Sequence, residues 1–519
     1  MANERVITPR RASAVLAVLV VAALHAGTAR AADPQPISYT IRFASLASHL
    51  ADVEATVPTD GRGSIDLMMP IWSPGFYRVE NYATRIQDIS ARTTTGASLA
   101  IEHPQGNRWH IDTRGASSVV VSYRLLCNER SVTTNFVGED YAVLTGGATF
   151  ITLVEDAGAR RPHDVSIELP PGWKQSMTGL DPGLDRAAHH YRAPDFDTLV
   201  DSPIVAGNPV VQTFDVAGSR HEIVEIGNVG AFDGARAAAD LKKVVEAQRR
   251  IWGELPFKKY DFLLVFRQGG GGLEHQNSML ATSNATATDT AAGYLRWLNF
   301  ISHEYCHAFN VKRLRPVELG PFDYEREPHT ESLWISEGFT SYMGSLAVMR
   351  AGLSTPQNFL DGLSGQIRQL QNAPGRLVQT LAQSSLDVWT SESVSGVNTN
   401  ANTSVSYYIK GQIAGFLLDA EVRSATGGAK SLDDVMRLAY QRYGGERGFT
   451  PGQFRATTSE VAGRDLSAWF QRVVSSTEEL DYTAALDWFG LRFVAGSWTL
   501  GVRDDATAAQ KDHLRALVQ

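Results

Sequence analysis

Two histidines lie four residues apart in the stretch His303-Glu304-Tyr305-Cys306-His307, with a glutamate directly after the first. On an α-helix, side chains four residues apart are separated by about 40° around the axis, so both imidazoles could reach one metal ion. A catalytic zinc site takes three protein ligands and keeps a fourth position open for water. Glu304 points away from the ligand direction and could accept a proton from that water. The stretch therefore predicts half of a hydrolytic metal site.

The third ligand must come from elsewhere in the chain. A third histidine six residues after His307 would complete one known class of zinc site, but residue 313 is arginine. Glu327 follows twenty residues after His307, and Pro328 comes next. A residue before proline is pushed out of helical geometry, so we expect Glu327 to lie in a loop.

Glu337 is the better candidate. It stands among apolar residues that include Trp334, Ile335 and Phe339, and a possible helix N-cap, Thr330, precedes them. A carboxylate in such surroundings is costly unless it meets a cation. We therefore predict that Zn²⁺ is held by His303, His307 and Glu337.

The elements that would position these residues fall into two groups. From Ile37 to about Val216 the chain alternates apolar and polar residues between turn signals, as in 37–43 and 118–125, which indicates an antiparallel β-sandwich. Beyond residue 230 the pattern changes. Asp233 is a candidate N-cap for a helix to Trp252, residues 260–266 predict a buried strand, and helical stretches dominate from 291 to about 474. The polar segment 384–406 is expected to be a long loop or disordered.

The first residues predict export. Three arginines precede an apolar run from Ala14 to Leu24, and Ala29-Arg30-Ala31 supplies small residues for a cleavage site. We assign residues 1–31 to a signal peptide, 32–216 to an N-terminal β domain, 217–490 to the catalytic domain and 491–519 to a C-terminal tail. The protein would then be periplasmic or secreted, with no stable membrane span after signal cleavage.

Composition limits the partners. The chain has 519 residues, 43% hydrophobic and 20% charged, and a net charge of −8, so nucleic acid is not an expected partner. Its longest basic cluster, Lys312-Arg313-Leu314-Arg315, is short. The two cysteines, Cys127 and Cys306, do not make a disulfide scaffold. The oligomeric state cannot be deduced.

These motifs together resemble the glycyl aminopeptidase family of zinc metallopeptidases. The resemblance rests on residues 303–316, on Leu333-Trp-Ile-Ser-Glu-Gly-Phe-Thr340, on Pro70-Ile-Trp-Ser-Pro-Gly-Phe-Tyr77 and on Tyr407-Tyr-Ile-Lys-Gly411. Members are gluzincins with a thermolysin-like catalytic domain, related to aminopeptidase N. The resemblance implies an α+β fold in which the N-terminal β-sandwich-like domain precedes a mainly helical catalytic domain. It also implies peptide substrates with a free N-terminus that begin with glycine or alanine.

Two further stretches gain a role from this resemblance. The run Gly269-Gly-Gly-Gly-Leu-Glu274 would by itself indicate a flexible turn. In the family, the similar segment is an edge strand along the substrate backbone, so Gly271 and Gly272 would bind substrate and Glu274 would hold its α-amine. Tyr408 corresponds to the oxyanion donor, and Tyr407 to a packing neighbour, although an exchange of roles between them stays open.

The chain departs from the family at its C-terminal end. Members often end in a PDZ domain, and residues 491–519 are too short for one, so that module is expected to be absent or truncated. The predicted activity is removal of N-terminal residues, with Glu304 as general base. Two alternatives remain: a thermolysin-like metalloendopeptidase, and a non-catalytic exported binding protein with a vestigial zinc site.

Overall fold

The computed structural model describes residues 1–2, 34–156, 160–389, 393–394, 397–398 and 400–518. Contacts divide the chain into Met1–Pro34 and a compact unit, Gln35–Gln519, which contains all the elements named below. The predicted signal peptide falls almost entirely on residues 3–33, outside the described residues. None of the described helices combines the length and apolar character needed to cross a bilayer.

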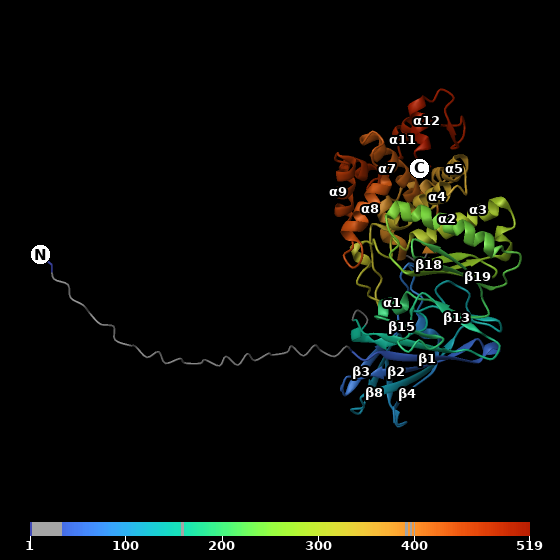
Figure 1. Cartoon of the computed structure of the whole chain (residues 1–519), viewed down its shortest axis with the longest axis vertical. Helices are drawn as coiled ribbons and strands as arrows, with labels where there is room; N and C mark the ends of the chain where they lie inside the picture. Colours follow the sequence, from blue (N-terminus) through green and yellow to red (C-terminus); the bar gives the residue numbers. More distant parts are fainter. Residues whose placement is uncertain (3–33, 157–159, 390–392, 395–396, 399, 519) are drawn as a thin grey trace. The chain divides into compact units, whose positions relative to one another are not determined.

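The N-terminal part of the compact unit is built from three sheets (Figure 1). The largest has the order β14-β15-β12-β1-β2-β8-β4-β5. Its strands are β1 (Ile37–Ser45), β2 (Leu50–Pro58), β4 (Ile86–Thr93), β5 (Ser98–Leu99), β8 (Ser118–Leu126), β12 (His163–Glu168), β14 (Asp181–Pro182) and β15 (His190–Ala193). All of its pairs are antiparallel except β1 with β12, which the sequence pattern did not indicate.

Two four-stranded sheets complete this part, in the orders β13-β16-β10-β9 and β11-β3-β7-β6. Their strands are β3 (Ser64–Met68), β6 (Ile101–Gln105), β7 (Arg108–Asp112), β9 (Phe136–Val137), β10 (Tyr141–Leu144), β11 (Thr152–Leu153), β13 (Gln175–Thr178) and β16 (Ile204–Gly207). All three sheets contribute to one hydrophobic core, which includes Tyr39, Leu67 and Ala206. The short helix α1 (Phe196–Val200) follows β15.

A five-stranded sheet then begins the second part, in the order β17-β18-β19-β21-β20. Its strands are β17 (Val210–Val216), β18 (Ser219–Gly227), β19 (Lys259–Phe266), β20 (Gly271–Glu274) and β21 (Ser278–Ser283). The hairpin β17–β18 joins this sheet, so the sheet starts within the segment 32–216. β20 lies at one edge of the sheet and, among the described residues, pairs only with β21. The side of β20 that faces away from β21 can therefore accept an extended chain.

Helix α2 (Gly234–Trp252) connects the parallel strands β18 and β19. As expected, the Asp233 carboxylate accepts a hydrogen bond from the Arg236 amide at 2.9 Å, and Gly253 ends the helix with φ 92°. Both ends of this helix were thus predictable from local chemistry.

The remaining helices pack on the five-stranded sheet and on one another, which confirms the predicted α+β class (Figure 1). They are α3 (Ala291–Cys306), α4 (Thr340–Arg350), α5 (Pro356–Gln371), α6 (Leu381–Leu386), α7 (Tyr407–Ala425), α8 (Leu432–Tyr443), α9 (Pro451–Ala462), α10 (Ser467–Val473), α11 (Thr483–Phe489) and α12 (Ala508–Arg515). A one-turn π-helix, η6 (Trp334–Phe339), precedes α4.

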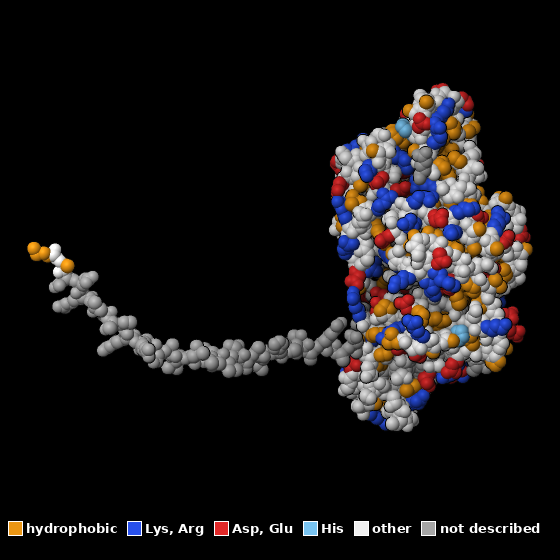
Figure 2. Space-filling view, viewed as in Figure 1, with side chains coloured by type: hydrophobic (Ala, Val, Ile, Leu, Met, Phe, Trp, Pro, Cys, Tyr) orange, Lys and Arg blue, Asp and Glu red, His pale blue; other side chains and the backbone are white. Residues whose placement is uncertain are grey.

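Short elements join these helices and the strands. The 3₁₀ turns are η1 (Leu46–Ser48), η2 (Tyr82–Arg85), η3 (Val154–Asp156), η4 (Ala285–Thr288), η5 (Val317–Leu319), η7 (Pro374–Leu377) and η8 (Asp387–Trp389). Within the polar segment 384–406, β22 (Ser393–Val394) pairs with β23 (Val397–Asn398). In the C-terminal tail, β24 (Leu491–Phe493) pairs with β25 (Leu500–Val502), and α12 follows. On the face seen in Figure 2, acidic and basic side chains are interspersed.

Two helical elements approach each other closely where η6 meets α7. A Cβ placed on Gly338 would overlap the backbone of Gly411, and one placed on Gly411 would lie 2.7 Å from the carbonyl oxygen of Trp334. Because two glycines face each other, η6 can sit directly on α7. This contact fixes the position of Glu337, which precedes Gly338, relative to the tyrosines at the start of α7.

We predict that Gly338→Ala lowers the midpoint of thermal unfolding, because the added methyl group forces η6 away from α7 at a cost of about 1–3 kcal/mol. The matched control is Gly362→Ala, in α5, where a Cβ meets no atom of the described residues within 4 Å. That change should leave the midpoint unchanged or raise it, since alanine favours helix by about 0.5–1 kcal/mol over glycine. Equal midpoints for the two variants would contradict the close-packing argument.

Candidate active site

The three predicted metal ligands converge on one point. The Nε2 atoms of His303 and His307 lie 2.9 Å apart, and Oε2 of Glu337 lies 3.5 Å and 3.1 Å from them. His303 is on the last turn of α3, and His307 caps the end of that helix. The rejected candidate Glu327 is exposed, and it pairs with His329 at 3.9 Å.

The other ring nitrogens of the two histidines are held by polar groups. Nδ1 of His307 lies 2.7 Å from the carbonyl oxygen of Asn310, and Nδ1 of His303 lies 3.2 Å from the hydroxyl of Ser341. When Nδ1 of His307 donates its proton to this carbonyl, Nε2 is the nitrogen left to face Glu337, and its lone pair is the one that a metal ion would take. The rings are therefore oriented as metal ligands require.

Asn310 also ties the histidine helix to the carboxylate. Its side-chain amide donates to the carbonyl of Ile335 at 2.9 Å and to the hydroxyl of Thr340 at 3.0 Å. These two residues flank Glu337 in sequence. The sequence pattern indicated no role for Asn310, and only its position three residues after His307 could have drawn attention to it.

Glu337 lies in the π-helix η6, where the sequence indicated a helix beginning near Thr330. Thr330 does accept a hydrogen bond, from the Ser332 amide at 3.2 Å, but the regular turn begins later. π-helical turns are rare and frequent at functional sites. The apolar pattern did not indicate that this turn is π-helical and not α-helical.

Glu304, the predicted general base, faces the same cleft. Burial raises the pKa of its carboxyl to about 8; His307 opposes the shift, and Glu274 and Glu337 reinforce it. A Cβ on Gly272 would overlap this carboxyl. The glycine at position 272 therefore lets the edge strand β20 pass directly beside Glu304, so Gly271 and Gly272 do lie along the cleft.

Glu274 ends the same strand. It is 4% exposed, and its Oε1 has no hydrogen-bond partner among the described residues. A Cβ on Gly75, from the N-terminal part, would lie only 2.5 Å from that oxygen. Burial raises the pKa of Glu274, His307 opposes this effect, and Glu337 adds to it. A buried carboxylate oxygen without a donor is a place where an added cation would be stabilised.

Tyr407 and Tyr408 both line the cleft, with ring centroids 4.9 Å apart. The Tyr408 ring stacks beside His303 at 6.1 Å, whereas the hydroxyl of Tyr407 is buried and without a hydrogen-bond partner among the described residues. Burial raises the pKa of both phenols, so both remain protonated donors at neutral pH. The fold thus brings both tyrosines to the site.

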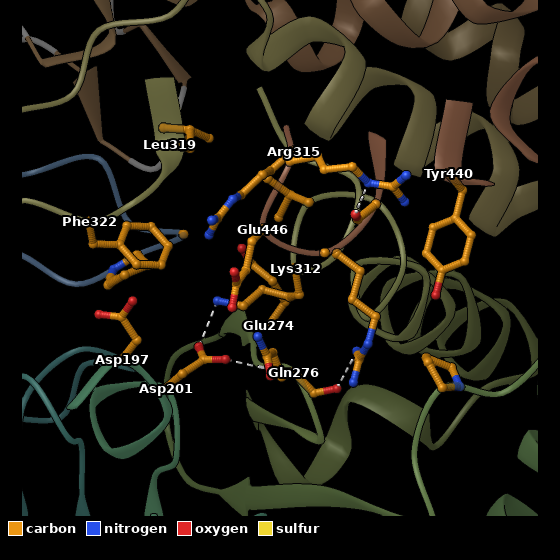
Figure 3. Close-up of a pocket in the computed structure, with 18 of the residues that line it drawn as sticks. Asp197, Asp201, Glu274, Gln276, Lys312, Arg315, Leu319, Phe322, Tyr440 and Glu446 are labelled. Carbon is orange, nitrogen blue, oxygen red and sulfur yellow. Dashed lines mark hydrogen bonds and ion pairs between the residues drawn. The ribbon is translucent and has the colours of Figure 1, made fainter. Parts of the chain in front are cut away.

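Asp201, which caps α1 in the N-terminal part, was not anticipated from the sequence. Its carboxylate accepts from Lys312 at 2.6 Å and from the Gln276 amide at 2.8 Å (Figure 3). It also accepts from Nδ1 of His275 at 3.0 Å. Burial favours the neutral acid, but Lys312 and His275 outweigh it and hold the pKa of Asp201 below its ordinary value. Because His275 and Gln276 directly follow Glu274, this cluster fixes the end of β20.

Two cavities meet at Glu274. The cleft that contains the histidines has a volume of about 600 Å³. A second cavity of about 780 Å³, shown in Figure 3, is lined by residues that include Asp197, Lys312 and Phe322. Gly75, Tyr77 and Glu274 line both cavities. They therefore form the partition between the two.

The residues present fit a zinc ion. Two imidazole nitrogens and one carboxylate oxygen converge within 4.8 Å of one another, and this donor set is one that catalytic zinc takes. Glu274, Glu304 and His307 form a second converging set that shares a ligand residue with the first. Because that set has only one nitrogen, the His303, His307 and Glu337 set is the better match for zinc.

Comparison with known proteins agrees with this geometry. Residues 38–208 match the Peptidase M61 N-terminal domain, and residues 296–414 match M61 glycyl aminopeptidase. The chain belongs to the M61 glycyl aminopeptidase family. It is therefore a peptidase, and the resemblance stated from the sequence is confirmed. Glu274 lies between the two matched segments, whereas the histidines, Glu337 and Tyr408 lie within the second. A search of curated proteins gives no match.

Two solved structures are similar to this M61 peptidase. An aminopeptidase N family protein from Idiomarina loihiensis has a TM-score of 0.82 and 26% identity, over 91% of this chain and 82% of that one. Yeast LTA4 hydrolase, solved with bestatin, has a TM-score of 0.53 and 15% identity, over 86% of this chain and 68% of that one. The second likeness shows a shared fold alone.

We predict that Asp201→Asn lowers the thermal midpoint, since it leaves the buried Lys312 ammonium without its counter-ion, a loss of about 3–5 kcal/mol. Lys312→Met added to Asp201→Asn should recover part of the loss, because it removes the stranded charge. A double variant no more stable than the single one would show that the ion pair does not carry the effect.

Proposed function

We propose that this peptidase is a zinc aminopeptidase that removes small N-terminal residues, glycine or alanine, from peptides. The observation that carries the proposal is the buried, partner-free Oε1 of Glu274 at the end of an edge strand, in the same cleft as His303, His307 and Glu337; this lack of a partner holds among the described residues. An α-ammonium group placed there would supply the missing donor. A peptide with a blocked N-terminus would leave that oxygen unpaired, and this asymmetry favours an exopeptidase over an endopeptidase.

His303, His307 and Glu337 would hold the metal, and a bound zinc ion would supply Lewis acidity at the scissile carbonyl. Glu304 accepts the proton of the attacking water and later passes it to the leaving amine. Burial raises the pKa of Glu304, and a metal cation beside it would lower that pKa toward the range in which a carboxylate both accepts and returns a proton. The outer edge of β20, at Gly271 and Gly272, pairs with the substrate backbone.

Tyr408 donates a hydrogen bond to the oxyanion that forms on the scissile carbonyl. Its ring is placed beside His303, and its phenol stays protonated because burial raises its pKa. Tyr407 supports the same cleft with a second hydroxyl. Preorganised donors of this kind typically contribute about 10²–10³ in rate.

The preference for glycine or alanine is supported by crowding around Glu274. Gly75 brings the backbone of the N-terminal part against its carboxyl. Tyr77 and Tyr407 are both buried and line the same cleft. Gly75, Tyr77 and Tyr407 thus form the part of the cleft wall against which a first side chain would lie.

Export is proposed from residues 1–31 alone, whose charge and apolar pattern is typical of a signal peptide. The mature enzyme would act in the periplasm or outside the cell. We keep the division into a β domain, 32–216, a catalytic domain, 217–490, and a tail, 491–519, as a proposal of domain organisation.

We predict that chelation abolishes hydrolysis of a glycyl peptide and lowers the thermal midpoint, and that added Zn²⁺ restores both. Glu304→Gln should retain zinc but lose about 10²–10⁴ in rate, because the proton acceptor is gone. The matched control is Glu327→Gln, which changes an exposed glutamate and should leave zinc content and rate unchanged. Zinc bound without hydrolysis of any peptide by the unaltered enzyme would favour the vestigial-site alternative.

We predict that the enzyme cleaves glycyl and alanyl peptides with a free amine and leaves the N-acetylated peptides intact. Glu274→Gln should lower kcat/KM for the free peptide about 10²-fold or more, since a buried charge pair is lost. The measurement is liberation of the first amino acid from paired free and acetylated substrates. Equal cleavage of both would identify an endopeptidase instead.

A further inference from the structure

The cleft has a second charged region, at the end of β20 opposite Glu274. Arg130 and Ser131 from the N-terminal part line the cleft together with Gly270 and Gly271. A Cβ on Gly271 would lie 3.8 Å from Cγ1 of Val132. The segment 130–132 therefore faces the N-terminal end of β20, whereas Glu274 lies at the C-terminal end of the same strand.

Arg130 has no carboxylate partner among the described residues. Its guanidinium lies over the Phe136 ring, 4.8 Å from the centroid, which holds it in place without neutralising it. Its neighbours differ in this respect, since Arg85 pairs with Glu129, and Arg78 pairs with Glu80 at 2.5 Å. Arg130 thus keeps its charge available to a ligand.

Arg267 adds a second uncompensated charge near the start of β20, because its amide donates to the carbonyl of Ser283 at 3.0 Å, next to Thr282, the partner of Gly271. It follows β19, is 8% exposed, and its Nη1 has no hydrogen-bond partner among the described residues. No ion pair of Arg267 is found within the part of the chain that the structure describes. Burial lowers the pKa of Arg267, Tyr141 opposes this effect, and the charge of Arg130 adds to it. Two guanidinium groups that repel each other stabilise an anion placed beside them.

The spacing of the two charged ends suits a short peptide. An extended chain rises about 3.3 Å per residue, so the three steps from Glu274 to Gly271 span about 10 Å. A peptide of about three residues, paired with β20 and with its amine at Glu274, would bring its terminal carboxylate to the start of the strand.

We propose that Arg130, reinforced by the field of Arg267, binds the C-terminal carboxylate of short peptides and makes this enzyme selective for substrates of about three residues. The inference rests on the proposed aminopeptidase function, because it takes the amine site at Glu274 as the other end of the substrate. Arg130 contacts the carboxylate, whereas Arg267 does not touch it and adds only its positive field.

The test compares Gly-Ala-Ala as the free acid, Gly-Ala-Ala amide and a hexapeptide with the same first three residues. We expect kcat/KM for the acid to exceed that for the amide and for the hexapeptide by about 10-fold or more. Arg130→Gln should lower the value for the acid and leave that for the amide unchanged. Arg267→Gln should reduce the same ratio by a smaller factor.

The matched control is Arg78→Gln, which removes another arginine of the cleft that already has a carboxylate partner. Its acid-to-amide ratio should equal that of the unaltered enzyme. A ratio near one in the unaltered enzyme, or an equal loss in Arg78→Gln and Arg130→Gln, would overturn the proposal and leave the aminopeptidase function standing.

Binding to Glu304→Gln separates the two proposals further. Calorimetric titration of this variant with the acid and the amide measures the carboxylate contact without hydrolysis. Tighter binding of the acid, lost in the double variant with Arg130→Gln, supports the carboxylate site even if no peptide is cleaved. Equal affinities for acid and amide reject it.

Discussion

Three buried carboxylates, Glu274, Glu304 and Glu337, share one cleft, and their mutual repulsion is the constraint that the surrounding structure must satisfy. Two imidazoles, His303 and His307, lie against Glu337, whereas Arg130, which has no carboxylate partner among the described residues, lines the cleft at the opposite end of β20 from Glu274. Glu337 is stabilised as an anion by His307 and His303, whereas burial raises the pKa of the other two acids. A metal cation and a substrate ammonium would supply the compensation that the chain lacks. Binding of cations is therefore what this cluster of acids is built to favour.

Holding these groups in place requires both parts of the compact unit. The N-terminal sheets contribute Gly75 and Tyr77 to the wall of the cleft, and Asp201 binds the residues that follow Glu274. The helical part contributes the histidines and Glu337, joined by Asn310. Because residues from both parts surround the edge strand β20, neither part holds the complete site by itself.

Local chemistry made several elements predictable. The four-residue spacing of His303 and His307, the apolar surroundings of Glu337 and the Asp233 cap each depend on neighbours within one or two turns, so the sequence displays them directly. Asp201 and Asn310 could not be found in this way. Asp201 lies 74 residues before His275, the side chain it anchors, and no periodic pattern marks such a pairing. The π-helical turn at Glu337 and the parallel pairing of β1 with β12 are likewise set by tertiary packing.

The partition made by Gly75, Tyr77 and Glu274 has a consequence for how such enzymes diverge. Two cavities of about 600 and 780 Å³ stand on either side of it, so the space beyond Glu274 is not filled by protein. The scaffold thus holds open volume on both sides of the site proposed for the substrate amine. Changes at these three residues would decide whether a substrate chain could extend on both sides of the scissile bond.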